Sequence, residues 1–149
     1  MLSFASSKLF DEKSFYQAFI GDLDKCEKEV IIESPFITSE RMKGFRSRFK
    51  KLLEREVKIY VFTRDPNEHE PSMKAQSEVE IANFERIGVQ TFICKGNHHR
   101  KLAILDRKTL WEGSLNILSQ ANSREIMRRV ECEEVASQMF EFLKLGRFI

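Results

Sequence analysis

Residues 97–116 limit the fold and the chemistry of this chain more than any other stretch. Within them Leu102–Leu105 is apolar enough for a buried strand, and an unusual run of polar residues precedes it. Because successive side chains of a strand point to opposite faces, His99 and Lys101 are expected to share one face. An imidazole and an ammonium group would then project side by side from one end of an apolar strand.

This pair of side chains suits a phosphate group. Lys101 supplies fixed positive charge, and the imidazole of His99 can attack phosphorus or donate a proton near neutral pH. A second short strand is predicted at Thr109–Glu112, and Gly-Ser-Leu-Asn follows it. If the chain stays extended, Ser114 and Asn116 point the same way and offer a hydroxyl and an amide to phosphate oxygens. We therefore predict that one sheet edge carries His, Lys, Ser and Asn together.

The spacing of these residues resembles the signature of the phospholipase D superfamily, which is His, any residue, Lys, four residues, Asp, six residues, then Gly-Ser or Gly-Gly and an Asn. Every spacing is kept here, by His99, Lys101, Asp106, Gly113, Ser114 and Asn116. The motif occurs once. Family members with one copy are short and dimerise to pair two motifs, so the resemblance implies a homodimer similar to the small bacterial endonucleases, or to modules attached to helicases and restriction enzymes.

The resemblance also implies a mechanism without a metal or other cofactor. His99 of one subunit would attack phosphorus and form a phosphohistidine, and the second His99 would protonate the leaving group and then activate water. Lys101 and Asn116 would hold the non-bridging oxygens, with Ser114 assisting. Glu125 matches the family's downstream acidic position and would hydrogen-bond the imidazole and set its tautomer.

Further residues are candidates for the site, and most of them have both a functional and a structural interpretation. Asp106 falls on the opposite strand face from His99, so a structural bond to backbone or to a basic group is expected. Ser34 is either part of the pocket or a plain strand exit, and Arg128 and Arg129 are either a basic rim that binds substrate or ordinary surface. The helix predicted from residue 38 to about residue 54 is rich in Lys and Arg, which indicates either a solvated face or contacts to a nucleic-acid backbone.

Hydrophobic periodicity predicts an alternation of helices and strands. Helices are expected at Phe10–Cys26, 38–54, Met73–Ile87 (with Val79, Ala82, Phe84 and Ile87 partly inward) and Glu133–Leu145, and strands at Glu29–Ser34, Val57–Thr63, Val89–Cys94, Leu102–Leu105, Thr109–Glu112 and Glu125–Cys132. Arg64–Ser72 is predicted to be a loop that borders the site. This order indicates an α/β fold, a mixed β-sheet flanked by helices on both faces, as in phospholipase D-like proteins, in a single domain over residues 1–149.

Composition narrows the function less than the motif does. The net charge of +2 does not by itself indicate nucleic acid, and three scattered cysteines indicate neither a disulfide framework nor a zinc site. We see no secretory signal and no transmembrane run, so a cytoplasmic protein is expected. The favoured function is a nuclease acting on DNA rather than RNA. The alternatives are a phospholipid phosphodiesterase and a non-catalytic nucleic-acid-binding module of a larger restriction or helicase system.

Overall fold

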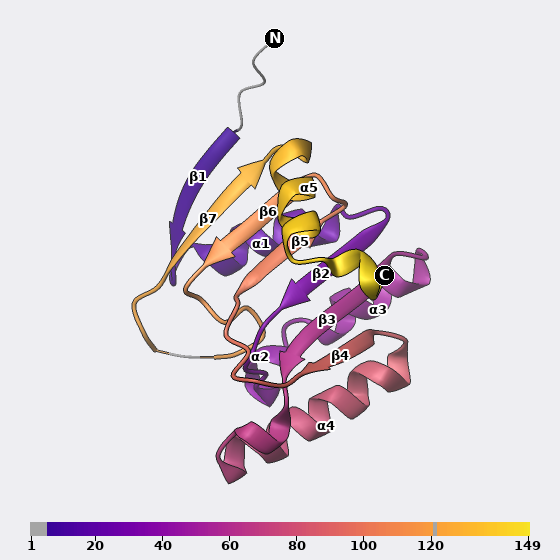
Figure 1. Ribbon diagram of the computed structural model, residues 1–149, viewed down its shortest axis with the longest axis vertical. Helices are drawn as coiled ribbons and strands as arrows, with labels where there is room; N and C mark the ends of the chain where they lie inside the picture. Colours follow the sequence, from indigo (N-terminus) through magenta and orange to yellow (C-terminus); the bar gives the residue numbers. More distant parts are fainter. Residues whose placement is uncertain (1–5, 121) are drawn as a thin grey trace.

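A seven-stranded mixed sheet forms the centre of the fold in the computed structural model, which describes residues 6–120 and 122–149 (Figure 1). The strands are β1 (Ser6–Asp11), β2 (Glu29–Glu33), β3 (Lys58–Arg64), β4 (Gln90–Cys94), β5 (Leu102–Leu105), β6 (Thr109–Gly113) and β7 (Ile126–Glu131). Their order across the sheet is β1-β7-β6-β5-β2-β3-β4. Strands β2, β3 and β4 run parallel, whereas β5, β6, β7 and β1 pair antiparallel.

Helices cover both faces of this sheet, as the sequence predicts. They are α1 (Phe15–Asp24), α2 (Ser39–Met42), α3 (Arg46–Glu54), α4 (Pro71–Ile87) and α5 (Glu133–Phe142), with short 3₁₀ turns η1 (Pro66–Glu68) and η2 (Leu145–Arg147). Side chains of α1, α3 and α4 pack with Val30, Ile32 and Ala103 in one buried cluster. Ile31, Leu102 and Ile104 point the other way and pack with α5 and η2 in a second cluster (Figure 1). No helix in the described ranges is long and apolar enough to cross a membrane.

Two predicted helices are divided in the structure. Residues 6–11 form strand β1, and helix α1 starts only at Phe15. The carboxylate of Asp11 accepts hydrogen bonds from the backbone N–H groups of Lys13 and Ser14, both at 2.9 Å, and this side-chain-bonded turn separates strand from helix. The helix predicted for residues 38–54 breaks between α2 and α3, around Gly44.

The inward face of α4 also differs from the prediction. Val79 is 56% exposed and Ala82 lies on the surface, whereas Ser77, Glu80 and Phe84 are buried. Glu80 tolerates burial because the guanidinium of Arg46 on α3 donates to both of its carboxylate oxygens, at 2.8 and 2.9 Å. The inward face of α4 thus carries a carboxylate that is bonded to a neighbouring helix as well as apolar side chains. The spacing of apolar residues within α4 could not predict this pair, because the partner, Arg46, lies on another helix.

Asp106 ties the far end of β5 to the start of β2. Its carboxylate accepts hydrogen bonds from the backbone N–H groups of Glu27, Lys28 and Glu29, at 2.9, 2.8 and 2.9 Å. Asp106 itself has a left-handed backbone with φ of 52°, a conformation that Asp and Asn adopt more readily than other non-glycine residues. The motif aspartate thus bonds backbone, at the opposite end of β5 from His99, and takes no part in the arrangement around the imidazole.

Replacing Asp106 tests this role. Asp106→Ala removes the acceptor for three backbone donors, and we expect the free energy of unfolding to fall by roughly 2–4 kcal/mol. Asp106→Asn keeps one side-chain oxygen and the tolerance for positive φ, so about half of that loss is expected. Urea unfolding followed by circular dichroism measures both. Equal stability of the two variants and the wild type would contradict the assignment.

Candidate active site

The register of the sheet gathers one end of every strand, β1 included, at a single edge. Glu33 of β2 pairs with Leu102 of β5, Leu102 pairs with Glu112 of β6, and Gly113 pairs with Met127 of β7. The carboxyl ends of β2, β3, β4 and β6 therefore meet the amino ends of β5 and β7 there. The candidate active site lies at this edge, where the segment 95–101 enters β5 and where β6 ends.

His99 is exposed on the segment that leads into β5. Its Nε2 atom lies 3.4 Å from Nη1 of Arg64, and Nη2 of the same guanidinium donates to Oδ1 of Asn97 at 2.7 Å. Arg64 is the last residue of β3, and sequence reasoning placed it in a loop. Since a guanidinium stays charged at any ordinary pH, it adds a second fixed positive charge beside the imidazole. The sequence signal that could have indicated Arg64 is its place at the end of a predicted parallel strand, where ligand sites commonly lie.

The two halves of the motif are joined through the backbone. The N–H group of Gly113 donates to the carbonyl oxygen of Lys101 at 3.3 Å, so the residues after β6 start beside the residues that lead into β5. The ammonium group of Lys101 donates to the carbonyl oxygen of His99 at 2.8 Å. The Lys101–Gly113 hydrogen bond therefore places the start of the Gly-Ser-Leu-Asn segment next to the segment that carries His99 and Lys101.

Gly113 is needed because strand β7 comes too close for a side chain. A Cβ atom at this position would run into the carbonyl oxygen of Ile126 and would lie 2.9 Å from Cα of Met127. The close approach is therefore to a neighbouring strand and not to a ligand. Ser114 continues the same contact, because its hydroxyl accepts from the N–H group of Ile126 at 3.0 Å.

The side-chain amide of Asn116 has an oxygen that accepts no hydrogen bond from the described residues. Its backbone carbonyl oxygen accepts from the hydroxyl of Tyr16 at 3.3 Å, which holds the segment after β6 against α1. Its side-chain Oδ1 atom is buried and has no hydrogen-bond partner among the residues that the structure describes. A buried polar atom without a partner is costly, so such an amide is suited to be completed by a ligand or by water.

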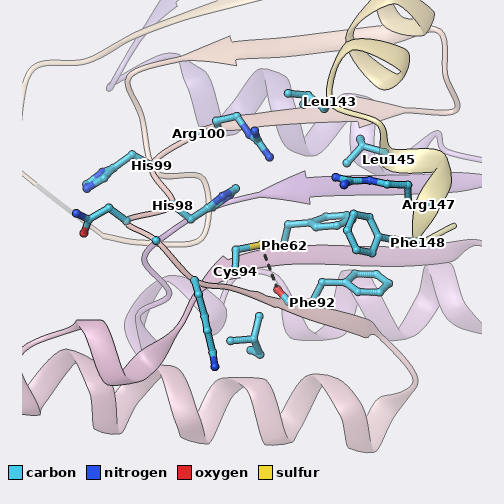
Figure 2. A pocket seen from close by; sticks show the side chains of 14 residues that line it. Phe62, Phe92, Cys94, His98, His99, Arg100, Leu143, Leu145, Arg147 and Phe148 are labelled. Carbon is cyan, nitrogen blue, oxygen red and sulfur yellow. Dashed lines mark hydrogen bonds between the residues drawn. The ribbon is translucent and has the colours of Figure 1, made fainter.

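A buried charge cluster lies behind His99, and sequence reasoning missed it. The Glu33 side chain is fully buried, and its Oε1 atom accepts from Nε and Nη2 of Arg100 at 3.2 and 3.0 Å. Nε2 of His98 lies 3.1 Å from the same oxygen, and the His98 side chain is only 7% exposed. One carboxylate therefore bonds Arg100 and lies against His98, the two sequence neighbours of His99, and Figure 2 shows both on the side away from His99. The sequence signal that could have indicated this cluster is Glu33 itself, an acidic residue at the end of an otherwise apolar strand, because a buried carboxylate needs a partner.

Two other candidates do not reach this arrangement. Ser34 is fully buried, where its hydroxyl donates to the carbonyl oxygen of Phe36 at 2.9 Å and accepts from the N–H group of Leu118 at 3.1 Å, so it has no access to substrate. Arg129 makes a bidentate ion pair with Asp22 of α1, at 2.6 and 3.1 Å. Both of these candidates serve the packing of the fold, because the strand faces that carry them are covered by other elements.

The remaining two candidates have partners of their own. Arg128 donates to the hydroxyl of Ser7 on β1 at 2.6 Å. The carboxylate of Glu125 accepts from the hydroxyl of Ser123 at 2.8 Å, and it lines a small hollow with Asn116. In the described part of this single chain Glu125 does not bond the imidazole of His99, because that ring lies beside Arg64 instead.

The basic helix region is also largely engaged within the protein. Arg46 pairs with Glu80, Arg48 pairs with Asp24, and Arg55 donates to the carbonyl oxygen of Cys26 at 2.7 Å. These bonds fasten α3 to its neighbours. They favour a structural reading of the charge over the reading as a surface for nucleic-acid backbone.

Comparisons with known proteins identify the family and the fold. The family model described as "Cardiolipin synthase, PLD-like domain" matches residues 19–144, and the chain therefore belongs to the phospholipase D superfamily of phosphodiesterases. No curated protein sequence matches the chain. Among solved structures it is similar to NucT from Helicobacter pylori, with 17% identity, 95% of this chain and 94% of that chain covered, and a TM-score of 0.73.

Two further structures share the fold. Nuc from Salmonella typhimurium, a phospholipase D family member, is 16% identical over 95% of this chain and 93% of its own, with a TM-score of 0.73. Polyphosphate kinase from Porphyromonas gingivalis has the same TM-score at 10% identity, but the match covers 94% of this chain and only 26% of that one. The α/β fold predicted from the sequence is thereby confirmed.

Neutralising Glu33 tests the cluster behind His99. Glu33→Gln leaves the guanidinium of Arg100 without its counter-charge, and we expect the free energy of unfolding to fall by about 2 kcal/mol, less than for a fully buried pair because Arg100 is half exposed. Glu40→Gln is the matched control, since Glu40 pairs with Lys43 in the open, and its stability should equal the wild type. Urea unfolding measures the stability of both variants. If Glu33→Gln were as stable as Glu40→Gln and the wild type, the structural role of the cluster would be contradicted.

Proposed function

We propose that this chain is a metal-independent endonuclease that cleaves DNA, or RNA, through a phosphohistidine formed at a homodimer interface. The observation that supports the proposal is the sheet edge itself. His99 is exposed there, and a backbone hydrogen bond joins Lys101 to Gly113, the first residue of the Gly-Ser-Leu-Asn segment. In that segment Oδ1 of Asn116 has no hydrogen-bond partner among the described residues. The fixed charge of Arg64 beside His99 supports the same reading, because a phosphodiester is an anion.

The proposed reaction has two displacement steps. Nε2 of one His99 bonds to phosphorus while the bond to the leaving-group oxygen breaks, and that oxygen takes a proton from the second His99. The second imidazole then deprotonates a water molecule. The water oxygen bonds to phosphorus while the bond between phosphorus and Nε2 of the first His99 breaks. Lys101 and Asn116 bind the non-bridging oxygens in both steps, and Ser114 helps to hold the turn that presents Asn116.

A second copy of the chain is part of this proposal. One motif supplies one imidazole, whereas the reaction needs a nucleophile and a separate proton donor. A two-fold axis that brings two such edges together supplies both from identical surfaces. The substrate is proposed to be nucleic acid, in line with the two small nuclease-like folds, Nuc and NucT, that match nearly the whole chain.

Cleavage in excess EDTA tests the proposal. Purified protein is incubated with single- and double-stranded DNA beside His99→Ala, and we expect the mutation to lower the rate at least roughly 10³-fold, since it removes both nucleophile and acid. Arg86→Ala is the control, because it removes a charged side chain on the surface of α4, where Arg86 donates to Asn83 at 2.9 Å. Its rate should stay close to that of the wild type.

Three results would contradict this function. Cleavage that EDTA abolishes would exclude a mechanism based on histidine alone, and cleavage retained in His99→Ala would place the chemistry elsewhere. Binding without any cleavage by a folded, dimeric wild type would favour a nucleic-acid-binding module.

A further inference from the structure

A large hollow opens beside His99 on the α5 side of the sheet, and the proposed chemistry does not use it (Figure 2). It has a volume of about 780 Å³, which is within the range of about 300–1,000 Å³ typical of ligand sites. Strands β3 and β4 form its floor, the segment 95–100 forms one wall, and the chain from Leu143 to Phe148 forms the opposite wall. Because His99 belongs to the first wall, a ligand in the hollow would lie next to the candidate active site.

Aromatic rings form one end of this hollow. Phe62 and Phe92 stack with ring centroids 4.7 Å apart, and the ring of Phe148 lies 5.5 Å from the first and 5.3 Å from the second. Phe148 is 44% exposed, so part of its ring remains open to a further planar group. The guanidinium carbon of Arg147 lies 5.0 Å from the Phe148 ring centroid, which adds a cation to the aromatic surface.

The charge of the lining is of one sign. Lys95, Arg100 and Arg147 line the hollow together with His98 and His99, and no acidic side chain lines it among the described residues. The buried Glu33 holds Arg100 and His98 from behind. Cys94 lies between the walls in Figure 2, and burial raises the pKa of its thiol, so it presents an uncharged surface near neutral pH. The ligand chemistry that fits is a flat aromatic group attached to an anion.

We propose that this hollow binds a nucleobase of the strand whose phosphate lies at His99, with Phe148 as the stacking surface. The inference rests on the proposed function, and it adds that the substrate strand is unpaired at this point. A base within a duplex is stacked on both sides and hydrogen-bonded to its partner, so only a single-stranded or locally opened strand can place a base there. Arg100 and Arg147 hold the sugar-phosphate backbone on either side of that base.

Binding measured without cleavage tests the proposal separately from the reaction. In a His99→Ala background, fluorescence anisotropy gives the Kd of a labelled single-stranded oligodeoxynucleotide, of an abasic strand of the same length, and of the duplex. Phe148→Leu keeps an apolar side chain against Phe62 and Phe92 but removes the ring. We expect it to raise the Kd of the base-carrying strand about tenfold and to leave the abasic strand unchanged.

Two further variants complete the test. Phe148→Trp keeps an aromatic surface and should bind the base-carrying strand at least as tightly as the protein with Phe148 does. Phe142→Ala removes an exposed ring of α5 that does not line the hollow, and it should change neither Kd. The proposal also requires the single strand to bind more tightly than the duplex.

The outcomes separate the hollow from the reaction. A tenfold loss confined to the base-carrying strand supports the nucleobase site even if the protein with His99 intact cleaves nothing. An affinity for that strand that Phe148→Leu leaves unchanged overturns the nucleobase site, even if the protein with His99 intact cleaves DNA. A loss of the dimer in Phe148→Leu, seen by light scattering and accompanied by equal changes for both strands, would assign the hollow to the subunit interface and overturn the proposal as well.

Discussion

The antiparallel hydrogen-bond ladder on both sides of β5 is the constraint on which the rest of the site depends. It sets Leu102 between Glu33 and Glu112 and lets the N–H group of Gly113 reach the carbonyl oxygen of Lys101. A shift by one residue would turn every side chain of β5 to the other face, so the register decides which residues meet at the sheet edge. At the far end Asp106 fastens the turn after β5 to the start of β2, which opposes such a slip.

The alternation of the chain before β5 divides the site into two parts. His99 lies at the rim of the hollow and points the opposite way from His98 and Arg100 in Figure 2, and these two turn toward Glu33 and the hollow. Chemistry and recognition can therefore sit on opposite sides of one short segment. The buried carboxylate of Glu33 connects them, because it holds the two residues that flank the imidazole. Its burial is tolerated because the guanidinium of Arg100 donates two hydrogen bonds to it and offsets part of the lost hydration.

The sequence was sufficient for the features that depend on local pattern. Strand alternation placed Asp106 on the face opposite His99, and the structure shows the expected bond of Asp106 to backbone. The shared face of His99 and Lys101, which precede β5, stays a prediction. Features that depend on distant pairing were not predictable in this way. Ser34 and Arg129 bond to partners far along the chain, and pairing between neighbouring strands places Glu33 and Arg64. Strand β1 is an edge strand that pairs with β7, which follows it by more than a hundred residues. The spacing of residues within one segment cannot predict these contacts, because each of them joins residues that are far apart in the sequence.

Trapping the covalent intermediate tests the proposed reaction most directly. Protein is mixed with a labelled oligonucleotide in EDTA, denatured within one turnover, digested and mapped by mass spectrometry. The histidine mechanism predicts a phosphoryl adduct on His99 that survives base and is lost in acid, as expected of a phosphorus–nitrogen bond. Turnover that proceeds with no adduct, or with the adduct on another residue, would contradict the assignment of His99 as nucleophile.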